Sequence, residues 1–129
     1  MDARMSPAAL RAQREYLGLT GDAMAARLGV RPDTVRGWES GKDPIPYGVP
    51  DEVRAVAAET AGHVEDLVQI VAQHPGDGWE PLVVERAAPT IRGYGMRWWR
   101  HVVVRAQDAT GADLTGLLVW PAHLAPLGR

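Results

Sequence analysis

Few residues in this sequence could take part in catalysis or metal binding, and their spacing predicts no catalytic or metal site. His63 and Asp66 fall on one face of a predicted helix, but two ligands do not make a metal site. No glycine-rich phosphate loop, serine nucleophile motif or pair of catalytic carboxylates is evident. We therefore expect no enzyme activity, no metal and no cofactor. The four histidines are dispersed along the chain at His63, His74, His101 and His123.

The charged side chains are more numerous, and they are unevenly distributed. The 129 residues carry 14 Lys and Arg against 16 Asp and Glu, a formal net charge of -2. Residues 1–49 hold seven basic and six acidic residues, whereas residues 50–129 hold seven and ten. The net charge shows no basic excess of the kind that many nucleic-acid-binding proteins have. A surface that binds nucleic acid therefore has to come from the local placement of basic residues.

The composition is that of a globular protein in a reducing compartment. Hydrophobic residues make up 46% of the chain and charged residues 23%. Cysteine is absent, which removes disulfides, thiolate metal sites and cysteine nucleophiles together. No apolar run approaches the ~18 residues that span a bilayer, and the N-terminus lacks the apolar core of a signal peptide. We expect a cytoplasmic protein.

The elements that must position the charged residues begin with three short helices. Ser6 and Thr20 are N-cap residues, whose side-chain oxygens accept a backbone N–H of the first helical turn. Gly18 and Gly29 stop the first two helices, and Gly29 can take the left-handed conformation of a C-cap. Pro32 opens the third helix. The predicted helices cover residues 7–17, 21–28 and 32–40.

The segment LTGDAMAARLGVRPDTVRGWESGKDPIP, residues 19–46, places two short helices around a glycine-containing turn. It resembles the helix-turn-helix of the Xre and lambda-repressor-like family of bacterial and phage regulators, and the resemblance covers roughly Ala8 to Val53. The residues that carry it are Leu17-Gly18-Leu19-Thr20, Ala25, Leu28-Gly29-Val30, Val35, Trp38, Glu39 and Gly41-Lys42.

The resemblance also implies an ion pair. In that family an arginine of the first helix lies against the glutamate that follows the core aromatic, and Arg14 and Glu39 occupy these positions. A partly buried ion pair costs free energy to desolvate, so its implied role is to fix how the helices dock. The alternative is two solvent-exposed charges.

The resemblance further implies that the third helix enters the DNA major groove. Arginine can fork onto guanine, aspartate can accept from the amino group of cytosine, and threonine can touch a phosphate or a thymine methyl group. For Asp33 the alternative is a favourable interaction with the helix dipole in the first turn. The implied base contacts are Arg31, Asp33, Thr34 and Arg36.

Phosphate contacts are implied at Thr20 and Gly21, through the amides of a helix N-terminus, and at Lys42, through its ammonium group. The sequence departs from the family at Pro32 and Gly37, where long polar side chains are common, and at Gly21, where glutamine is common. Base contacts should therefore be fewer than usual, with more of the specificity coming from DNA shape.

The second half of the sequence predicts a long helix followed by a small sheet. An apolar stripe at helical spacing runs from residue 51 to about residue 72. After the breaker HPGDG, three short segments are rich in β-branched and aromatic residues, which is typical of antiparallel strands. These segments are residues 80–86, 96–107 and 114–120, with residues 109–113 as a hairpin loop.

We therefore predict an α+β fold with two domains. Residues 1–50 form a helix-turn-helix DNA-binding domain, and residues 51–129 form a dimerisation domain of one helix and an antiparallel sheet. On a strand, Trp98 and Trp99 point to opposite faces, so one fills the core and the other meets a partner. We expect this pair in a homodimer interface. The arrangement resembles small regulators of the YdiL-like and anti-CRISPR-associated type, which dimerise through the C-terminal half.

The function expected from these features is a sequence-specific repressor that binds a palindromic operator as a homodimer. One alternative is an antitoxin-like module whose C-terminal half binds a partner protein and whose N-terminal half only autoregulates. Another is a sheet that senses a small molecule. The basic segment with Arg92, Arg97, Arg100 and Arg105 has two interpretations, a surface for RNA or flanking DNA, or solvated arginines on a strand face.

Overall fold

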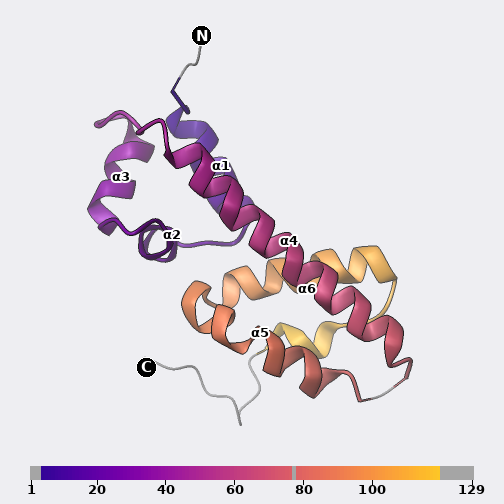
Figure 1. The fold of residues 1–129 in the computed structure, drawn as a ribbon. Coiled ribbons are helices and arrows are strands. Elements are labelled where there is room, and N and C mark those ends of the chain that lie inside the picture. Colours follow the sequence, from indigo (N-terminus) through magenta and orange to yellow (C-terminus); the bar gives the residue numbers. More distant parts are fainter. Residues whose placement is uncertain (1–3, 77, 120–129) are drawn as a thin grey trace. The chain divides into compact units, whose positions relative to one another are not determined.

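The computed structural model describes residues 4–76 and 78–119, and within these residues the fold is entirely helical (Figure 1). Because no strand occurs in the described residues, the predicted α+β fold with an antiparallel sheet is wrong. Every described helix is too short or too polar to cross a membrane. The helices are α1 (Pro7–Tyr16), α2 (Gly21–Leu28), α3 (Pro32–Ser40), α4 (Val49–Gln73), α5 (Glu80–Tyr94), α6 (Met96–Thr110) and the 3₁₀ helix η1 (Thr115–Leu118).

The chain divides into two compact units, and the division falls within α4. Unit 1 is Met1–Glu59 and unit 2 is Thr60–Arg129, whereas the sequence placed the boundary at residues 50/51. The buried side chains of α4 follow one stripe along the helix at intervals of three and four residues, which is the period of an α-helix. The stripe consists of Val49, Val53 and Val56 in unit 1, and of Thr60, Val64 and Leu67 in unit 2.

Unit 1 packs α1, α2, α3 and the first part of α4 around an aliphatic core with one tryptophan. Ser6 caps α1 as predicted, since its hydroxyl oxygen accepts the N–H of Ala9 at 3.0 Å. Across the unit, Arg27 of α2 lies 3.9 Å from Glu59 of α4. The buried residues before α4 are Leu10, Leu17, Leu19, Met24, Ala25, Val35, Trp38 and Ile45.

Unit 2 is where the sequence prediction failed, and the reason lies in the spacing of its apolar residues. The segments predicted as the first two strands are the helices α5 and α6. Their buried residues recur in adjacent pairs every four positions, which is the period of an α-helix with a wide apolar face rather than of a strand. They are Val83, Val84, Ala87, Ala88, Ile91 and, three residues further on, Tyr94 in α5, and Trp98, Trp99, Val102, Val103 and Ala106 in α6.

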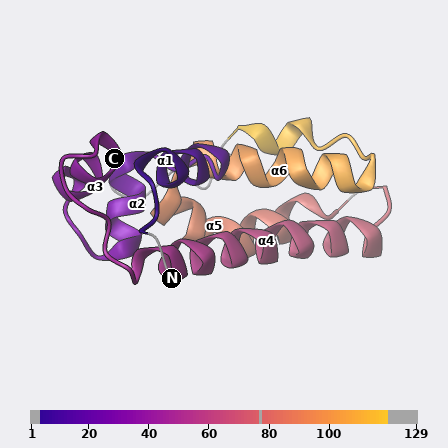
Figure 2. The ribbon, with the colours of Figure 1, turned by 90° about the horizontal axis from the view of Figure 1, so that it is seen from above.

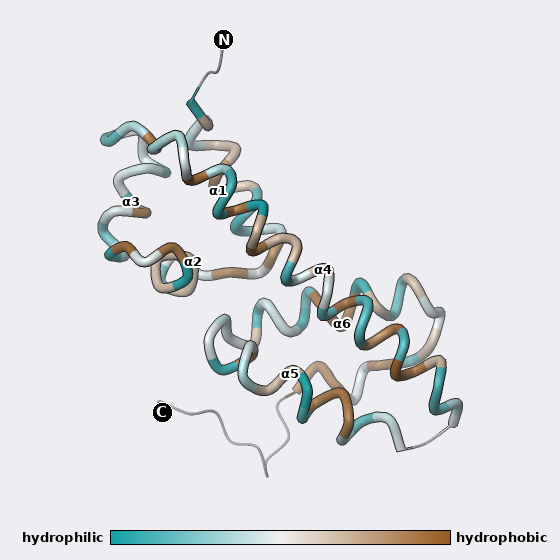
Figure 3. Tube along the Cα trace, in the orientation of Figure 1, coloured by the Kyte–Doolittle hydropathy of each residue, from teal (hydrophilic) through white to brown (hydrophobic). Residues whose placement is uncertain are grey.

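Packing of this face overrides the β-propensity of valine and tryptophan, which mainly measures how well a side chain packs on its neighbours. Figure 3 shows hydrophobic residues recurring between hydrophilic ones along the helices. The third predicted strand is also absent from the described residues. The 3₁₀ helix η1 stands in its place, and residue 120 lies outside the described part of the chain.

Trp98 and Trp99 are both in the core, with 0% and 1% of their surfaces exposed. Adjacent residues on a helix are about 100° apart, so both rings can be buried on one wide face. Each indole N–H has a partner, Thr60 Oγ1 at 2.9 Å for Trp98 and the carbonyl of Leu117 at 2.7 Å for Trp99. Trp98 and Trp99 therefore do not point to opposite faces as expected on a strand, which was the reason for expecting one of them in a homodimer interface. The described part of unit 2 contains helices and no strand, which gives no support to the resemblance to YdiL-like and anti-CRISPR-associated regulators.

Polar contacts join the helices of unit 2 to one another. His63 of α4 forms a 3.0 Å hydrogen bond with Thr90 of α5, and its ring meets that of Trp98 of α6 edge-on, with 5.2 Å between the centroids. Gly95 is the single residue between α5 and α6, and its φ of +95° is a conformation that L side chains rarely adopt. In Figure 2, the later part of α4, α5 and α6 run side by side.

Candidate nucleic-acid interface

The turn between α2 and α3 is three residues long and is held by backbone hydrogen bonds. Gly29 ends α2 with a φ of +71°, and the N–H of Val30 donates to the carbonyl of Ala25 at 2.9 Å. This pattern is the Schellman C-cap, in which glycine supplies the left-handed residue. Arg31 is the N-cap of α3, and Pro32 is its first residue. The sequence predicted these helix boundaries because each of them depends on a local turn residue.

Helix α3 has one buried and one exposed face. Val35 and Trp38 lie in the core of unit 1, with 1% and 6% of their surfaces exposed. Of the four predicted base contacts, three are exposed and Thr34 is half-buried. The structure therefore brings Arg31, Asp33 and Arg36 together on the solvent side of α3, as a docked recognition helix requires.

Asp33 is surrounded by positive charge. Its carboxylate forms an ion pair with Arg36, one helical turn away, and both side chains are largely exposed at 71% and 66%. The hydrogen bond from Arg36 lowers the pKa of Asp33, and the charges of Arg36, Arg31 and Lys42 lower it further. Three cations, Arg31, Arg36 and Lys42, thus lie near Asp33 at this end of unit 1, where Asp43 is a second anion.

Gly37 lies beneath the loop that follows α3, a contact that the sequence did not reveal. The N–H of Asp43 donates to the carbonyl of Gly37 at 3.1 Å, and a Cβ at residue 37 would lie 2.5 Å from Asp43 Oδ2. The only sequence signal was a glycine inside a helix where longer side chains are common. Together these residues line a surface hollow formed by Asp33, Arg36, Gly37, Ser40, Lys42 and Asp43.

Ser40, which the sequence indicated only as the end of the third helix, closes the turn that presents Lys42. Its hydroxyl donates to the carbonyl of Gly37 at 3.2 Å and accepts the N–H of Lys42 at 3.3 Å. Gly41 stands between them with a φ of +82°. The Lys42 side chain is exposed, so its ammonium group is available to an anion such as a phosphate.

Arg14 and Glu39, which were expected to pair, form a bidentate ion pair that locks α1 to α3. Arg14 Nε and Nη2 donate to the two carboxylate oxygens at 2.7 and 2.8 Å, and only 15% and 11% of the two side chains are exposed. Arg14 Nη1 also donates to the carbonyl of Leu19 at 3.0 Å. The hydrogen bond to Glu39 raises the pKa of Arg14, so the guanidinium stays charged. The two charge-assisted bonds to Glu39 fix the orientation of α3 against α1, and the third bond ties Arg14 to the segment before α2.

Thr20 and Gly21, the predicted phosphate contacts, lie at the N-terminus of α2. The Thr20 hydroxyl oxygen accepts the N–H of Ala23 at 3.0 Å, which makes it the N-cap. Thr20 is exposed and Gly21 is half-buried. The hydroxyl proton of Thr20 remains a donor, since the cap uses only the oxygen as acceptor.

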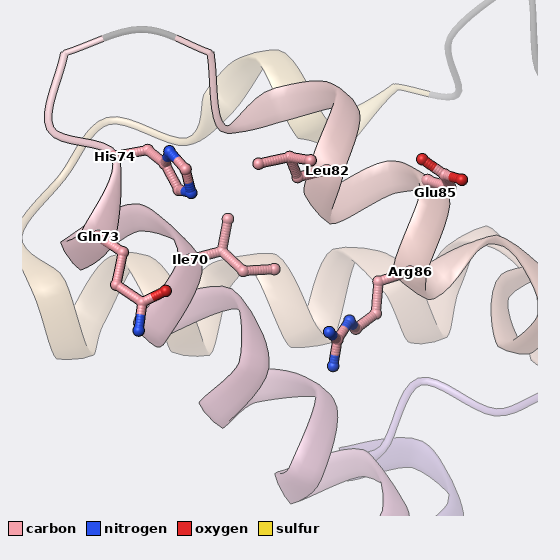
Figure 4. Close-up of a pocket in the computed structure, with 6 residues that line it drawn as sticks. All are labelled: Ile70, Gln73, His74, Leu82, Glu85 and Arg86. Carbon is pink, nitrogen blue, oxygen red and sulfur yellow. The ribbon is translucent and has the colours of Figure 1, made fainter.

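A further hollow lies in unit 2, between the end of α4 and α5 (Figure 4). Ile70 and Leu82 point toward one another across it. The charged side chains on its edge, Glu85 and Arg86, have opposite signs, and Arg86 also lies 3.6 Å from Asp66. Among the described residues no group of three or more His, Asp or Glu lies close enough together to hold a metal ion.

Residues 8–69 match a family model described as a helix-turn-helix domain. This part of the chain is therefore similar to helix-turn-helix domains, a class of unit known for binding DNA. The match includes all of α2 and α3, most of α1 and the greater part of α4. No curated protein and no solved structure matches the chain.

Proposed function

We propose that this protein is a non-catalytic transcriptional regulator, a repressor that binds an inverted-repeat operator as a homodimer through α3. The observation that supports it best is the cationic cluster of Arg31, Arg36 and Lys42 on the exposed side of the helix-turn-helix domain. A single helix-turn-helix buries little DNA surface, and two copies on half-sites one helical turn apart provide the missing affinity. Because the cluster near α3 has only a few cations, binding by two copies matters more for this protein.

The proposed base recognition uses the ion pair between Asp33 and Arg36, which opens so that each side chain can contact a base. An exposed pair of this kind contributes about 0–1 kcal/mol, so it opens at small cost. A good bidentate contact with a base contributes about 1–3 kcal/mol of discrimination. In the complex, Arg36 turns to the O6 and N7 atoms of guanine, and Asp33 accepts from a cytosine amino group.

The remaining contacts of α3 are fewer and lie near its N-terminus. Arg31 and Thr34 belong to the first turn, where side chains of a recognition helix approach base edges. Gly37 offers no side chain, and the Asp43 carboxylate lies against it. Specificity in the second half of the operator half-site therefore comes from DNA shape, and Lys42 holds a phosphate.

The test begins with selection of a preferred duplex from a random pool by the full-length protein. Arg36→Ala should weaken binding to the selected duplex roughly 10-fold to 100-fold, which corresponds to the loss of one base contact. It should change binding to random duplexes far less. Lys42→Ala should weaken both and should flatten the salt dependence. Footprinting on the upstream region of the protein's own gene then locates the operator.

Arg11→Ala is the matched control, because Arg11 is also an exposed helical arginine paired with a carboxylate, that of Glu15 at 3.4 Å. It should leave binding unchanged. If Arg36→Ala binds the selected duplex like the wild type, α3 does not read the operator. If the protein copurifies with a stoichiometric partner whose activity it blocks, and selects no duplex, the antitoxin-like function replaces the repressor.

A further inference from the structure

The exposed face of α6 is basic and carries no acidic residue over its first three turns. Its side chains recur at intervals of three and four residues opposite the buried tryptophans, so they share one face of the helix. From residue 86 to residue 107 the sequence holds five arginines and no aspartate or glutamate. We define the α6 arginine face as Arg97, Arg100, His101, Val104 and Arg105, of which His101 and Arg105 are half-buried and the others exposed.

Within the described residues, two arginines of this face, Arg97 and Arg100, keep their positive charge unpaired. In the described part of the chain, Arg97 and Arg100 take part in no ion pair and no hydrogen bond. Arg105 Nη1 lies 3.2 Å from His101 Nε2, and because arginine can only donate, the imidazole is the acceptor. Burial lowers the pKa of His101, and the charge of Arg105 lowers it further. Among the residues that the structure describes, the unpaired positive charge of the face therefore comes from the guanidinium groups of Arg97 and Arg100.

The chemistry of this face fits phosphate better than a lipid surface. Guanidinium binds phosphate through parallel hydrogen bonds, and the nine helical residues from Arg97 to Arg105 place such groups over about 12 Å. A membrane-binding helix needs large apolar side chains beside its cations. Here the large apolar side chains of α6 are in the core, and Val104, 45% exposed, is the apolar residue that remains on the face.

We propose that the α6 arginine face binds the phosphate backbone of double-stranded DNA and adds sequence-independent contacts to those of the helix-turn-helix domain. This inference rests on the proposed function, since that function brings DNA to the protein. Phosphate contacts carry no sequence information, but they release condensed counterions and increase affinity. The face thereby compensates for the small cationic cluster on α3.

The test compares full-length variants on a random-sequence duplex over a range of salt concentrations. Arg97→Gln combined with Arg100→Gln should lower the slope of log K against log salt by about 1.8, since each phosphate contact contributes about 0.9. Binding near physiological salt should fall roughly tenfold or more. Both side chains are exposed and unpaired, so the melting temperature should not change.

The matched control is Arg54→Gln combined with Arg86→Gln. These two arginines are also exposed and helical, but each pairs with a carboxylate, Arg54 with Asp51 and Arg86 with Asp66. The control removes the same net charge and should leave the slope unchanged. An equal fall of the slope in the control would attribute the effect to net charge and overturn the proposal, and so would an unchanged slope in the α6 variant.

Other partners give different outcomes. If the α6 variant loses binding to RNA of the same sequence but keeps wild-type binding to the DNA duplex, the face is an RNA surface and the proposal is wrong. Loss of a copurifying acidic protein with an unchanged DNA slope also overturns it. If the wild type selects no operator, but its duplex binding still depends on Arg97 and Arg100, the proposed function fails while this inference stands.

Discussion

At the scale of single residues, Gly37 shows how a position can be misinterpreted from the sequence. The sequence suggested only a missing base-reading side chain. In the structure the α3 backbone at Gly37 lies against Asp43, whose N–H donates to the Gly37 carbonyl and whose carboxylate fills the space of a Cβ. This contact joins residues six apart across the end of a helix, and no local pattern in the sequence specifies it. By contrast, the resemblance to a known family correctly implied that Arg14 and Glu39 pair.

The Gly37 contact predicts a substitution whose effect depends on its neighbour. In the wild type, Gly37→Ala should leave the free energy of unfolding nearly unchanged, because displacing the exposed Asp43 carboxylate offsets the helix-forming gain of alanine. In an Asp43→Ala background the same change should raise it by about 0.5–1 kcal/mol, the usual gain of alanine over glycine in a helix. Urea unfolding of the four proteins measures both. The same effect in both backgrounds would show that Asp43 does not constrain residue 37.

At the scale of elements, helix ends were predicted well and helix interiors in unit 2 were not. Ser6, Thr20, Gly29 and Gly41 each act through their own backbone or hydroxyl group, so the local sequence is sufficient. In α5 and α6 the same valines and aromatic residues suit a strand or a helix. Their buried pairs every four residues are the deciding signal, and Trp98 finds its polar partner on a distant helix, at Thr60.

Thr20 connects an element boundary to the proposed DNA contact. Thr20→Ala should lower the free energy of unfolding by about 1 kcal/mol, because the N–H of Ala23 loses its side-chain acceptor at the start of α2. Thr20→Ser is the control, since its hydroxyl keeps both the cap and the donor, and it should be close to the wild type. Thermal unfolding without DNA measures the cap. An unchanged melting temperature for Thr20→Ala would show that the hydroxyl does not stabilise α2 as a cap. The proposed phosphate contact would then be its only role.

At the scale of the whole molecule, the net charge of -2 conceals two separate basic surfaces. One is the cluster around α3 in unit 1, and the other is the α6 arginine face in unit 2. The sequence located both runs of arginine, but it could not show that the second lies on one face of a helix, because the segment was predicted as a strand. The acidic residues between them reduce the total without removing either surface.

Two compact units joined by one continuous helix should have separate stabilities, because local unfolding follows cooperative packing units rather than the whole chain. Ile91→Ala removes a buried side chain of unit 2, 4% exposed, and should cost roughly 2–5 kcal/mol there. Hydrogen exchange should then show weaker protection of amides in α5, α6 and the later part of α4, with α1 to α3 unchanged. Val35→Ala in unit 1 should give the reverse pattern. If either substitution lowers protection equally in all helices, α4 couples the two cores into one folding unit.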